Sequence, residues 1–235
     1  MRAAEAGATF RCDGVLEGEL RARGFLRVAG VDEVGRGALF GPVVAAAVVL
    51  DPERPVRGLD DSKVLEPERR EVLAGRIRER ALAWAVAAVD AASIDSINIY
   101  QASRLAMKTA VERLTPPADF VLVDAVPLDL LVPQRAIIHG DARCQAIAAA
   151  SILAKVERDA WMRIWDEVFP EYGLAGHKGY ATREHTRALA EHGVTPLHRL
   201  SFEPVRACSL FPVEGDASCA GQMELFPSRE AAACR

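Results

Sequence analysis

The stretch Ala29–Leu50, AGVDEVGRGALFGPVVAAAVVL, sets two adjacent acids and a glycine-rich turn between two apolar segments. Residues 27–32 and 42–50 are rich in valine and small apolar residues, a composition that predicts two buried strands. The glycines between them predict a tight connection. A chain that only had to fold would rarely keep two neighbouring carboxylates beside such strands, so the acids indicate a function.

The acidic pair is Asp32 and Glu33, at the end of the first predicted strand. Adjacent residues of a regular strand face opposite sides of the sheet, so the two carboxylates cannot both face one site unless the strand twists at its end. Gly35 and Gly37 follow at once and supply the backbone freedom for such a turn.

The other predicted elements follow from apolar periodicity. Further strands are expected at residues 82–90, 119–125 and 134–141. Helices are expected at residues 60–81, 98–114, 142–169 and 182–193. Helical spacing directs a set of apolar side chains toward the core, among them Val72, Leu73, Ile77, Ile152, Val156 and Ile164. Strands in series, then strands alternating with helices, predict an α/β fold with a mixed sheet flanked by helices.

The chain has 235 residues and a net charge of −4, which suits one domain with appendages and gives no overall attraction to nucleic acid. Its five cysteines are widely spaced and form no C-x-x-C pair, which favours a reducing compartment over a disulfide framework. The first residues contain no apolar signal core, and the longest apolar run has 13 residues, too short to span a bilayer. We therefore expect a cytoplasmic protein that acts away from membranes.

Three of the predicted strands end in acids, namely Asp32 with Glu33, Asp124 and Asp141. One such acid is commonly a cap or turn residue, but three strand ends together indicate a site, because functional groups gather beyond strand ends. Clustered carboxylates raise each other's pKa unless cations neutralise them, and oxygen ligands suit Mg²⁺ or Mn²⁺. Two such ions about 4 Å apart support phosphoryl transfer. A two-metal phosphodiesterase is our hypothesis, and a carboxylate-pair glycosidase is disfavoured because only 6% of residues are aromatic.

Longer motifs extend this pattern in a fixed order. They include AGVDEVGRGALFGP, LDDSKVL, GDARCQAIAAASILAKVERD, GHKGYATREH and HRLSF. Together they resemble bacterial ribonuclease HII over residues 25–206. The family usually has G-R-G-P-L-A-G-P, and we interpret Ala38 and Phe40 here as changes in loop packing.

The resemblance implies an RNase H-like fold and divalent-metal-dependent hydrolysis of RNA in RNA/DNA hybrids, including single ribonucleotides embedded in duplex DNA. It implies cleavage 5′ to the ribonucleotide, leaving 3′-hydroxyl and 5′-phosphate ends. The family's catalytic and metal-binding acids, which would hold two Mn²⁺ or Mg²⁺ ions, fall on Asp32, Glu33, Asp124 and Asp141. The loop that recognises the ribonucleotide 2′-hydroxyl, largely through backbone groups, falls on Gly35, Arg36 and Gly37. The tyrosine that packs against the following deoxyribose falls on Tyr180.

Three more residues are candidates for substrate contact. Lys63 precedes a predicted helix, and its match to the family favours phosphate contact over a merely solvated lysine. Ser151 and Lys155 lie four residues apart and so share one face of the long helix. Structural support and phosphate contact both stay open for this pair.

Residues 171–206 form a polar, histidine-rich segment in which we expect helices and a surface for the duplex backbone. No H-E-x-x-H zinc motif is present. The predicted surface consists of His177, Lys178, Arg183, His185, Arg187, His192, His198 and Arg199. The nearby Trp161 and Trp165 are expected to pack in the core.

Residues 1–24 are expected to be a lead-in and residues 207–235 a flexible tail. The tail contains GQMELF, which resembles the bacterial sliding-clamp-binding pentapeptide, with contacts from Gln222, Met223, Leu225 and Phe226. A tail folded back on the core is the alternative. The expected partners are RNA/DNA hybrids, ribonucleotide-containing duplex DNA and the clamp, bound by a monomer. The competing class is a non-catalytic, clamp-tethered adaptor for such duplexes, which the retention of all four acids disfavours.

Overall fold

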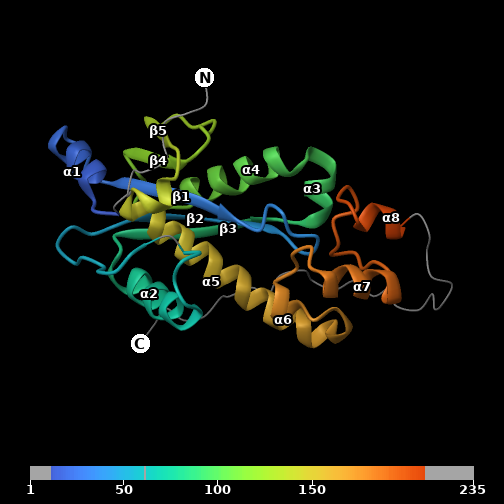
Figure 1. The fold of residues 1–235 in the computed structure, drawn as a ribbon. Coiled ribbons are helices and arrows are strands. Elements are labelled where there is room, and N and C mark those ends of the chain that lie inside the picture. Colours follow the sequence, from blue (N-terminus) through green and yellow to red (C-terminus); the bar gives the residue numbers. More distant parts are fainter. Residues whose placement is uncertain (1–11, 61, 210–235) are drawn as a thin grey trace, which may run out of the picture.

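The computed structural model describes residues 12–60 and 62–209. Its centre is a five-stranded sheet in the order β3-β2-β1-β4-β5 (Figure 1). The strands are β1 (Val28–Val34), β2 (Val43–Val49), β3 (Ala83–Val89), β4 (Phe120–Asp124) and β5 (Gln134–Ile137). β2 is antiparallel to both of its neighbours, β1 and β3, whereas β4 pairs in parallel with β1, and β5 pairs in parallel with β4. The mixed sheet predicted from sequence is therefore confirmed.

Helices cover both faces of this sheet (Figure 1). Helices α2 (Pro67–Arg80) and α5 (Gln145–Val168) pack on one face, and α3 (Ala91–Ile97) and α4 (Ile99–Glu112) pack on the other. β2 is buried along its whole length because it lies second in the sheet and has a helical layer on each side. Two apolar cores result, one on each face.

Gly30 of β1 allows α5 to lie unusually close to the sheet. A Cβ atom added at Gly30 would be 2.1 Å from the backbone carbon of Ala146, in the first turn of α5. Since no side chain fits in that space, strand and helix backbones are in direct contact. This approach brings the start of α5 and the residues just before it to the middle of the sheet.

The strand register places the acids side by side. Val31 of β1 pairs with Val123 of β4, so Asp32 and Asp124 are the next residues along two adjacent parallel strands. Asp124 in turn pairs with Ile137 at the end of β5. β5 ends at Ile137, so the prediction that Asp141 ends this strand was wrong; Asp141 lies in the 3-10 turn that follows, η1 (Gly140–Ala142). The acids therefore lie together near the C-terminal ends of the adjacent strands β1 and β4.

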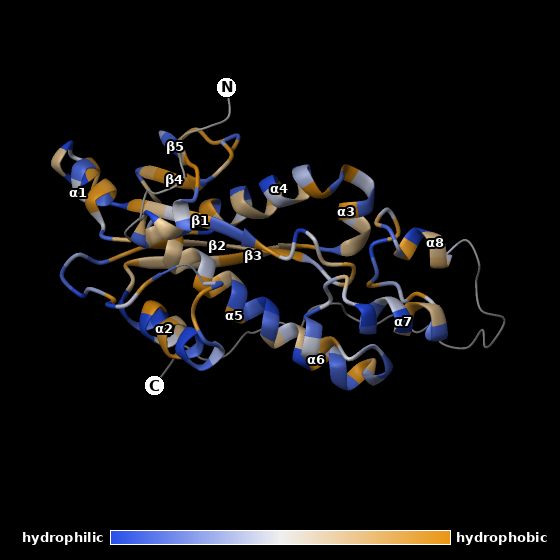
Figure 2. Cartoon of the chain, viewed as in Figure 1, coloured by the Kyte–Doolittle hydropathy of each residue, from blue (hydrophilic) through white to orange (hydrophobic). Residues whose placement is uncertain are grey.

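The C-terminal part forms a third apolar core around the outer half of α5. Its elements are η2 (Pro170–Tyr172), α6 (Leu174–His177), α7 (Arg183–His192) and α8 (Val205–Ser209). Figure 2 shows α5 mostly apolar where it crosses the sheet and more polar beyond it, toward these elements. Phe40 is fully buried in this core and makes edge contacts with Trp165 and His198 at centroid distances of 5.7 and 4.9 Å. The loop-packing interpretation of Phe40 and the core interpretation of Trp165 fit this arrangement.

The predicted lead-in contains a helix, α1 (Val15–Ala22), that packs on the domain. Glu17 is buried, and its Oε1 accepts a hydrogen bond from the backbone N–H of Ala146 at 2.8 Å. This carboxylate caps the positive end of α5 from a distant part of the chain. α1 therefore packs as part of the fold, although the catalytic domain was expected to begin at residue 25.

Several expectations were wrong in detail. α2 begins at Pro67, seven residues later than predicted from residue 60, because proline is favoured at the first position of a helix. Val72 and Ile164 are exposed, since the buried faces of their helices lie around Leu73 and Met162. α3 was not predicted, and α8 continues to Ser209 where a tail was expected from residue 207.

No helix within the described residues is both long and apolar enough to cross a membrane.

Candidate active site at the ends of β1 and β4

Asp32 and Glu33 both belong to β1, which continues to Val34 instead of ending at the first acid. Asp32 lies on the α5 side of the sheet, where Ser151 hydrogen-bonds its carboxylate. Its Oδ1 also accepts the backbone N–H of Glu33 at 2.7 Å. The Asp124 charge acts on both acids, raising the pKa of each. Both carboxylates are therefore close enough to Asp124 to belong to one electrostatic cluster.

Asp124 and Asp141 are held by the turn between β5 and α5. Asp124 Oδ1 accepts the backbone N–H of Gly140 at 2.8 Å, and Asp141 Oδ1 accepts that of Ala142 at 3.0 Å. A Cβ atom at Gly140 would be only 3.1 Å from Asp124 Oδ1. Glycine at this position therefore leaves room for the Asp124 carboxylate beside the turn.

The acids carry more negative charge than their surroundings stabilise. Burial, followed by the charges of Glu33 and Asp124, raises the pKa of Asp32 well above its ordinary value. Burial also raises the pKa of Glu33 and Asp124, with further upward contributions from the neighbouring acids. Such a cluster favours added positive charge.

Two cationic side chains supply part of that charge. Lys63 Nζ lies 2.9 Å from Asp141 Oδ2, and Arg36 Nη1 lies 3.1 Å from Glu33 Oε1. These contacts show where the cluster accepts cations, and its all-oxygen donor set fits Mg²⁺ or Mn²⁺. Within the described residues, no three acidic, histidine or cysteine side chains are already arranged to hold a metal. A metal would therefore compete with the Lys63 and Arg36 ion pairs.

Ser151 and Lys155 project from α5 beside the cluster. Ser151 Oγ lies 2.8 Å from Ser62 Oγ in a buried contact that connects α5 to the segment carrying Lys63. Lys155 Nζ forms an ion pair with Asp159 at 2.8 Å and lies 5.9 Å from the centroid of the Tyr180 ring. This geometry gives Ser151 a supporting contact to Asp32 and leaves Lys155 facing the tyrosine.

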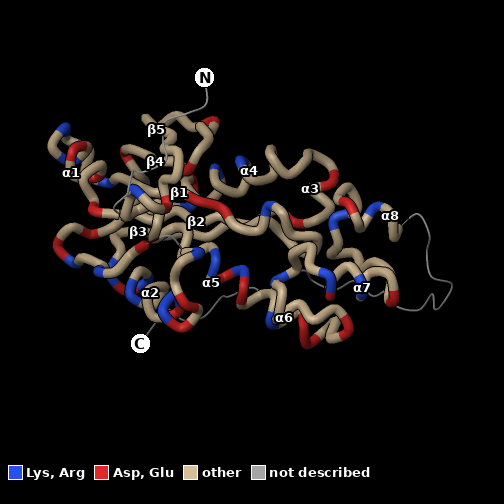
Figure 3. Tube along the Cα trace, viewed as in Figure 1, with Lys and Arg blue, Asp and Glu red and all other residues tan. Residues whose placement is uncertain are grey.

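The glycine-arginine-glycine loop follows directly after the acids, at the end of β1, where Figure 3 shows clustered acidic residues. Gly35 is buried with φ +89°, a conformation that favours glycine, whereas Arg36 and Gly37 are exposed. Ala38 pairs in an isolated antiparallel bridge with Tyr180. The two predicted sugar-recognition elements are thus neighbours, although they are more than 140 residues apart in sequence.

The predicted duplex surface of residues 171–206 was wrong for three of its members. His185, His198 and Arg199 are buried, with exposed fractions of 0, 1 and 0%. The Thr195 N–H donates to His198 Nδ1, so His198 Nε2–H donates to His185 Nε2 at 3.2 Å, and His185 Nδ1–H donates to the Tyr180 carbonyl at 3.1 Å. The two histidines therefore support Tyr180 from inside. Arg183 and Arg187 are exposed, as the prediction required.

Sequence reasoning missed several residues around the site. Arg158 is fully buried and contacts the Gly35 loop, Asp159 pairs with Lys155, and Ser62 contacts Ser151. All three stand inside motifs that were recognised as blocks, LDDSKVL and AKVERD. For Arg158 and Asp159 the sequence did contain a signal, because both are charged residues within the apolar part of the long helix. A buried charge needs partners, so such residues are candidates for contacts to the site.

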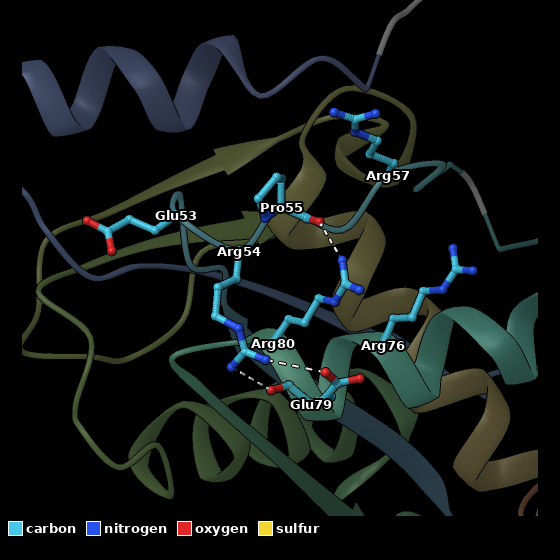
Figure 4. Close-up of a pocket in the computed structure, with 7 residues that line it drawn as sticks. All are labelled: Glu53, Arg54, Pro55, Arg57, Arg76, Glu79 and Arg80. Atoms are coloured by element: carbon cyan, nitrogen blue, oxygen red, sulfur yellow. Dashed lines mark hydrogen bonds and ion pairs between the residues drawn. The ribbon is translucent and has the colours of Figure 1, made fainter.

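A separate pocket of about 560 Å³ lies between the segment 53–57 and the last turn of α2 (Figure 4). Arg54 contacts Glu79 and Arg80 donates to the Pro55 carbonyl, so two of its four arginines are engaged. None of the predicted site residues lines it.

The mixed five-stranded sheet flanked by helices defines a protein of the RNase H-like fold. Comparison with solved structures agrees. Ribonuclease H2 from Pyrococcus horikoshii is 27% identical, covering 77% of this chain and 96% of that chain, with a TM-score of 0.66. Ribonuclease HII from Archaeoglobus fulgidus, solved as a complex with PCNA, is 28% identical, covering 76% and 96%, with a TM-score of 0.64.

The chain belongs to the ribonuclease HII family. The family model for ribonuclease HII matches residues 29–205. Ribonuclease HII from Solibacter usitatus is 69% identical over 232 residues, which are 99% of this chain and 100% of that protein. The chain is therefore an endoribonuclease, of a family that acts on RNA/DNA hybrids and depends on divalent metal ions.

Proposed function

We propose that this enzyme nicks duplex DNA on the 5′ side of an embedded ribonucleotide, and hydrolyses the RNA strand of hybrids, by a two-metal mechanism that leaves 3′-hydroxyl and 5′-phosphate ends. The observation that carries the proposal is the group of four acids in β1, β4 and η1, beside the Gly35–Gly37 loop, in which burial raises the pKa of Asp32, Glu33 and Asp124. In this proposal, the carboxylates that hydrolyse the strand and the backbone that recognises the sugar would belong to one site.

Asp32, Glu33, Asp124 and Asp141 would hold the Mn²⁺ or Mg²⁺ ions, which activate water and stabilise the leaving oxygen when bound. The chain's own groups perform the remaining tasks. The Lys63 side chain is 77% exposed, and its long stem would let the ammonium group exchange its carboxylate partner for a substrate phosphate. The exposed Gly37 backbone permits close approach to a ribose 2′-hydroxyl, the group that distinguishes RNA from DNA. The Tyr180 ring would pack on the next, deoxyribose sugar.

A nicking assay tests this proposal. The substrates are a DNA duplex with one ribonucleotide, the same duplex without it, and a continuous RNA/DNA hybrid, each with Mg²⁺, Mn²⁺ or EDTA. We expect metal-dependent nicking of the first duplex, none of the second, and products that a ligase and a phosphatase identify as 3′-hydroxyl and 5′-phosphate. Binding without nicking in either metal would contradict the proposal and favour the non-catalytic adaptor.

We further propose that Gln222, Met223, Leu225 and Phe226 bind the replication sliding clamp. These residues lie outside the described part of the chain, so the proposal rests on the sequence motif, and the PCNA complex of the Archaeoglobus fulgidus relative supports it. Burying three apolar side chains contributes roughly 1.5–3 kcal/mol each before ordering costs, which predicts affinity in about the micromolar range. Equal clamp binding by the wild type and a Leu225→Ala/Phe226→Ala variant would contradict it. A monomer in the cytoplasm stays our expectation.

A further inference from the structure

Two arginines are fully buried behind the Gly35–Gly37 loop. Arg158 of α5 and Arg199, which follows the last histidine, both have exposed fractions of 0%. Neither forms an ion pair with a carboxylate of the described residues. Arg199 Nη2 is also buried without a hydrogen-bond partner in this part of the chain. Burying two such cations is costly, so a purely structural role would be filled more stably by apolar side chains.

Both arginines donate to backbone carbonyls of the same loop. Arg199 donates to the carbonyls of Arg36 and Gly41 at 2.8 and 2.9 Å. Arg158 donates to the carbonyls of Phe40, Pro42 and Lys178 at 3.1, 3.3 and 2.8 Å. The two guanidinium groups thus connect the loop to the segment that carries Tyr180.

The contact from Arg199 to Arg36 orients one particular peptide group. In a trans peptide the C=O and the following N–H point in opposite directions. Since the Arg36 carbonyl points inward to Arg199, the N–H of the exposed Gly37 points outward. No hydrogen-bond partner for this N–H is found within residues 12–60 and 62–209.

Arg158 fixes the same loop relative to Tyr180. Its guanidinium carbon lies 5.4 Å from the centroid of the Tyr180 ring. A Cβ atom at Gly35 would be 2.2 Å from Arg158 Nε, so Gly35 leaves the space that this side chain occupies. Backbone hydrogen bonds between Leu39 and Gly179, and between Arg199 and Leu39, join the segments further.

We propose that Arg158 and Arg199 are positioning residues for sugar recognition, which hold the outward N–H of Gly37 at a fixed place relative to the Tyr180 ring. This inference rests on the proposed function. It assigns to the two arginines the choice of the bond that is cut, and leaves metal binding and hydrolysis to the acids. A misplacement of about 1 Å at such a site can reduce the rate by about 100-fold.

The test uses a DNA duplex with four consecutive ribonucleotides in one strand, and the cleaved bonds are mapped at single-nucleotide resolution. We expect the wild type to cut mainly the bond 5′ to the last ribonucleotide, next to the DNA. Arg199→Met should spread the cuts over the ribonucleotide run and lower kcat/KM at the junction by roughly 10- to 100-fold, with Mn²⁺ affinity unchanged. Arg199→Lys, which keeps the charge but only one donor group, should restore part of the junction preference.

Met107→Ala serves as the control, because Met107 is fully buried in the core around α4 and does not contact the loop. It should lower thermal stability and leave the cut positions unchanged. If Arg199→Met does not fold, the positions of the bonds cleaved by Arg199→Lys and Arg158→Lys test the inference instead. Variants that slow cleavage evenly while keeping the junction preference would overturn the inference alone. A wild type that cuts all ribonucleotide bonds equally would overturn the proposed junction recognition together with it.

Discussion

Lys63 and Asp141 form an ion pair of 2.9 Å although they are 78 residues apart in the chain. The ammonium group occupies one carboxylate oxygen of a proposed metal ligand. Burial raises the pKa of the neighbouring Asp124, and the Lys63 charge opposes part of this rise. A lysine in this position can stabilise the acid cluster before substrate binds and then contact a phosphate.

Lys63→Met should therefore have two effects of opposite sign. Mn²⁺ should bind the free enzyme up to roughly fivefold more tightly, because an exposed ion pair is worth at most about 1 kcal/mol. KM for the ribonucleotide-containing duplex should rise, because a phosphate contact is lost. Calorimetric metal titration and steady-state kinetics measure the two effects. Lys108→Met on α4, which removes the ion pairs of Lys108 with Asp129 and Glu112, is the matched control. Weaker metal binding by Lys63→Met would contradict this account.

Gly30→Ala should destabilise the fold strongly. The added Cβ would lie 2.1 to 2.4 Å from backbone atoms at the start of α5, and neither backbone can move without disturbing the acids. We expect a loss of about 3 kcal/mol or more in the free energy of unfolding. Gly75→Ala is the control, because nothing lies within 4 Å of a Cβ there. In the interior of α2 it should stabilise by about 0.5–1 kcal/mol. Equal urea midpoints for the two variants would refute the close approach.

Glu17→Ala should show that the N-terminal helix belongs to the domain. The change removes the acceptor for the Ala146 N–H at the start of α5, at an expected cost of about 1–2 kcal/mol. Glu19→Ala is the control on the same helix, since Glu19 is exposed and should change stability by less than about 0.5 kcal/mol. Both values come from urea denaturation. Indistinguishable effects would mean that Glu17 does not cap α5.

The buried histidines predict a loss of stability in mild acid. Burial lowers the pKa of His185 to about 4, and burial with the neighbouring His185 lowers that of His198 to about 3. Between about pH 6.5 and pH 4 the unfolded chain takes up protons that the folded chain does not, so stability falls as the pH falls. His198→Gln should reduce this pH-dependent loss in the free energy of unfolding by about 2 kcal/mol. Thermal denaturation of both proteins across this range measures it, and parallel curves would contradict the prediction.

The strands were predictable because valine-rich runs bounded by glycines leave few alternatives, and the strand-end acids could be recognised without coordinates. α3 was missed because AASIDSI has too few apolar residues to show a helical period. Val72 was placed on the wrong side because Val72 and Leu73 are adjacent, and periodicity alone does not choose between neighbours.

The tertiary contacts of the site were less accessible. Arg199 looked like a residue for phosphate contact because it stands among histidines and other basic residues, yet it donates to the carbonyls of Arg36 and Gly41. That contact joins positions more than 150 residues apart, and no local pattern encodes it. The sequence identified the candidate acids, whereas the residues that support them could be found only from the fold.

If the four clustered acids perform hydrolysis and do not bind the duplex themselves, removing the charge of one acid should stop nicking and leave duplex binding intact. The most direct measurement compares Asp141→Asn and Asp32→Asn with wild type, using single-turnover nicking of a duplex with one ribonucleotide and binding of the same duplex in EDTA. The control is Asp129→Asn, because that carboxylate is 91% exposed and lies outside the cluster. We predict no detectable nicking by the two site variants, with duplex affinity retained and the control unchanged. Substantial nicking by either site variant would contradict the account.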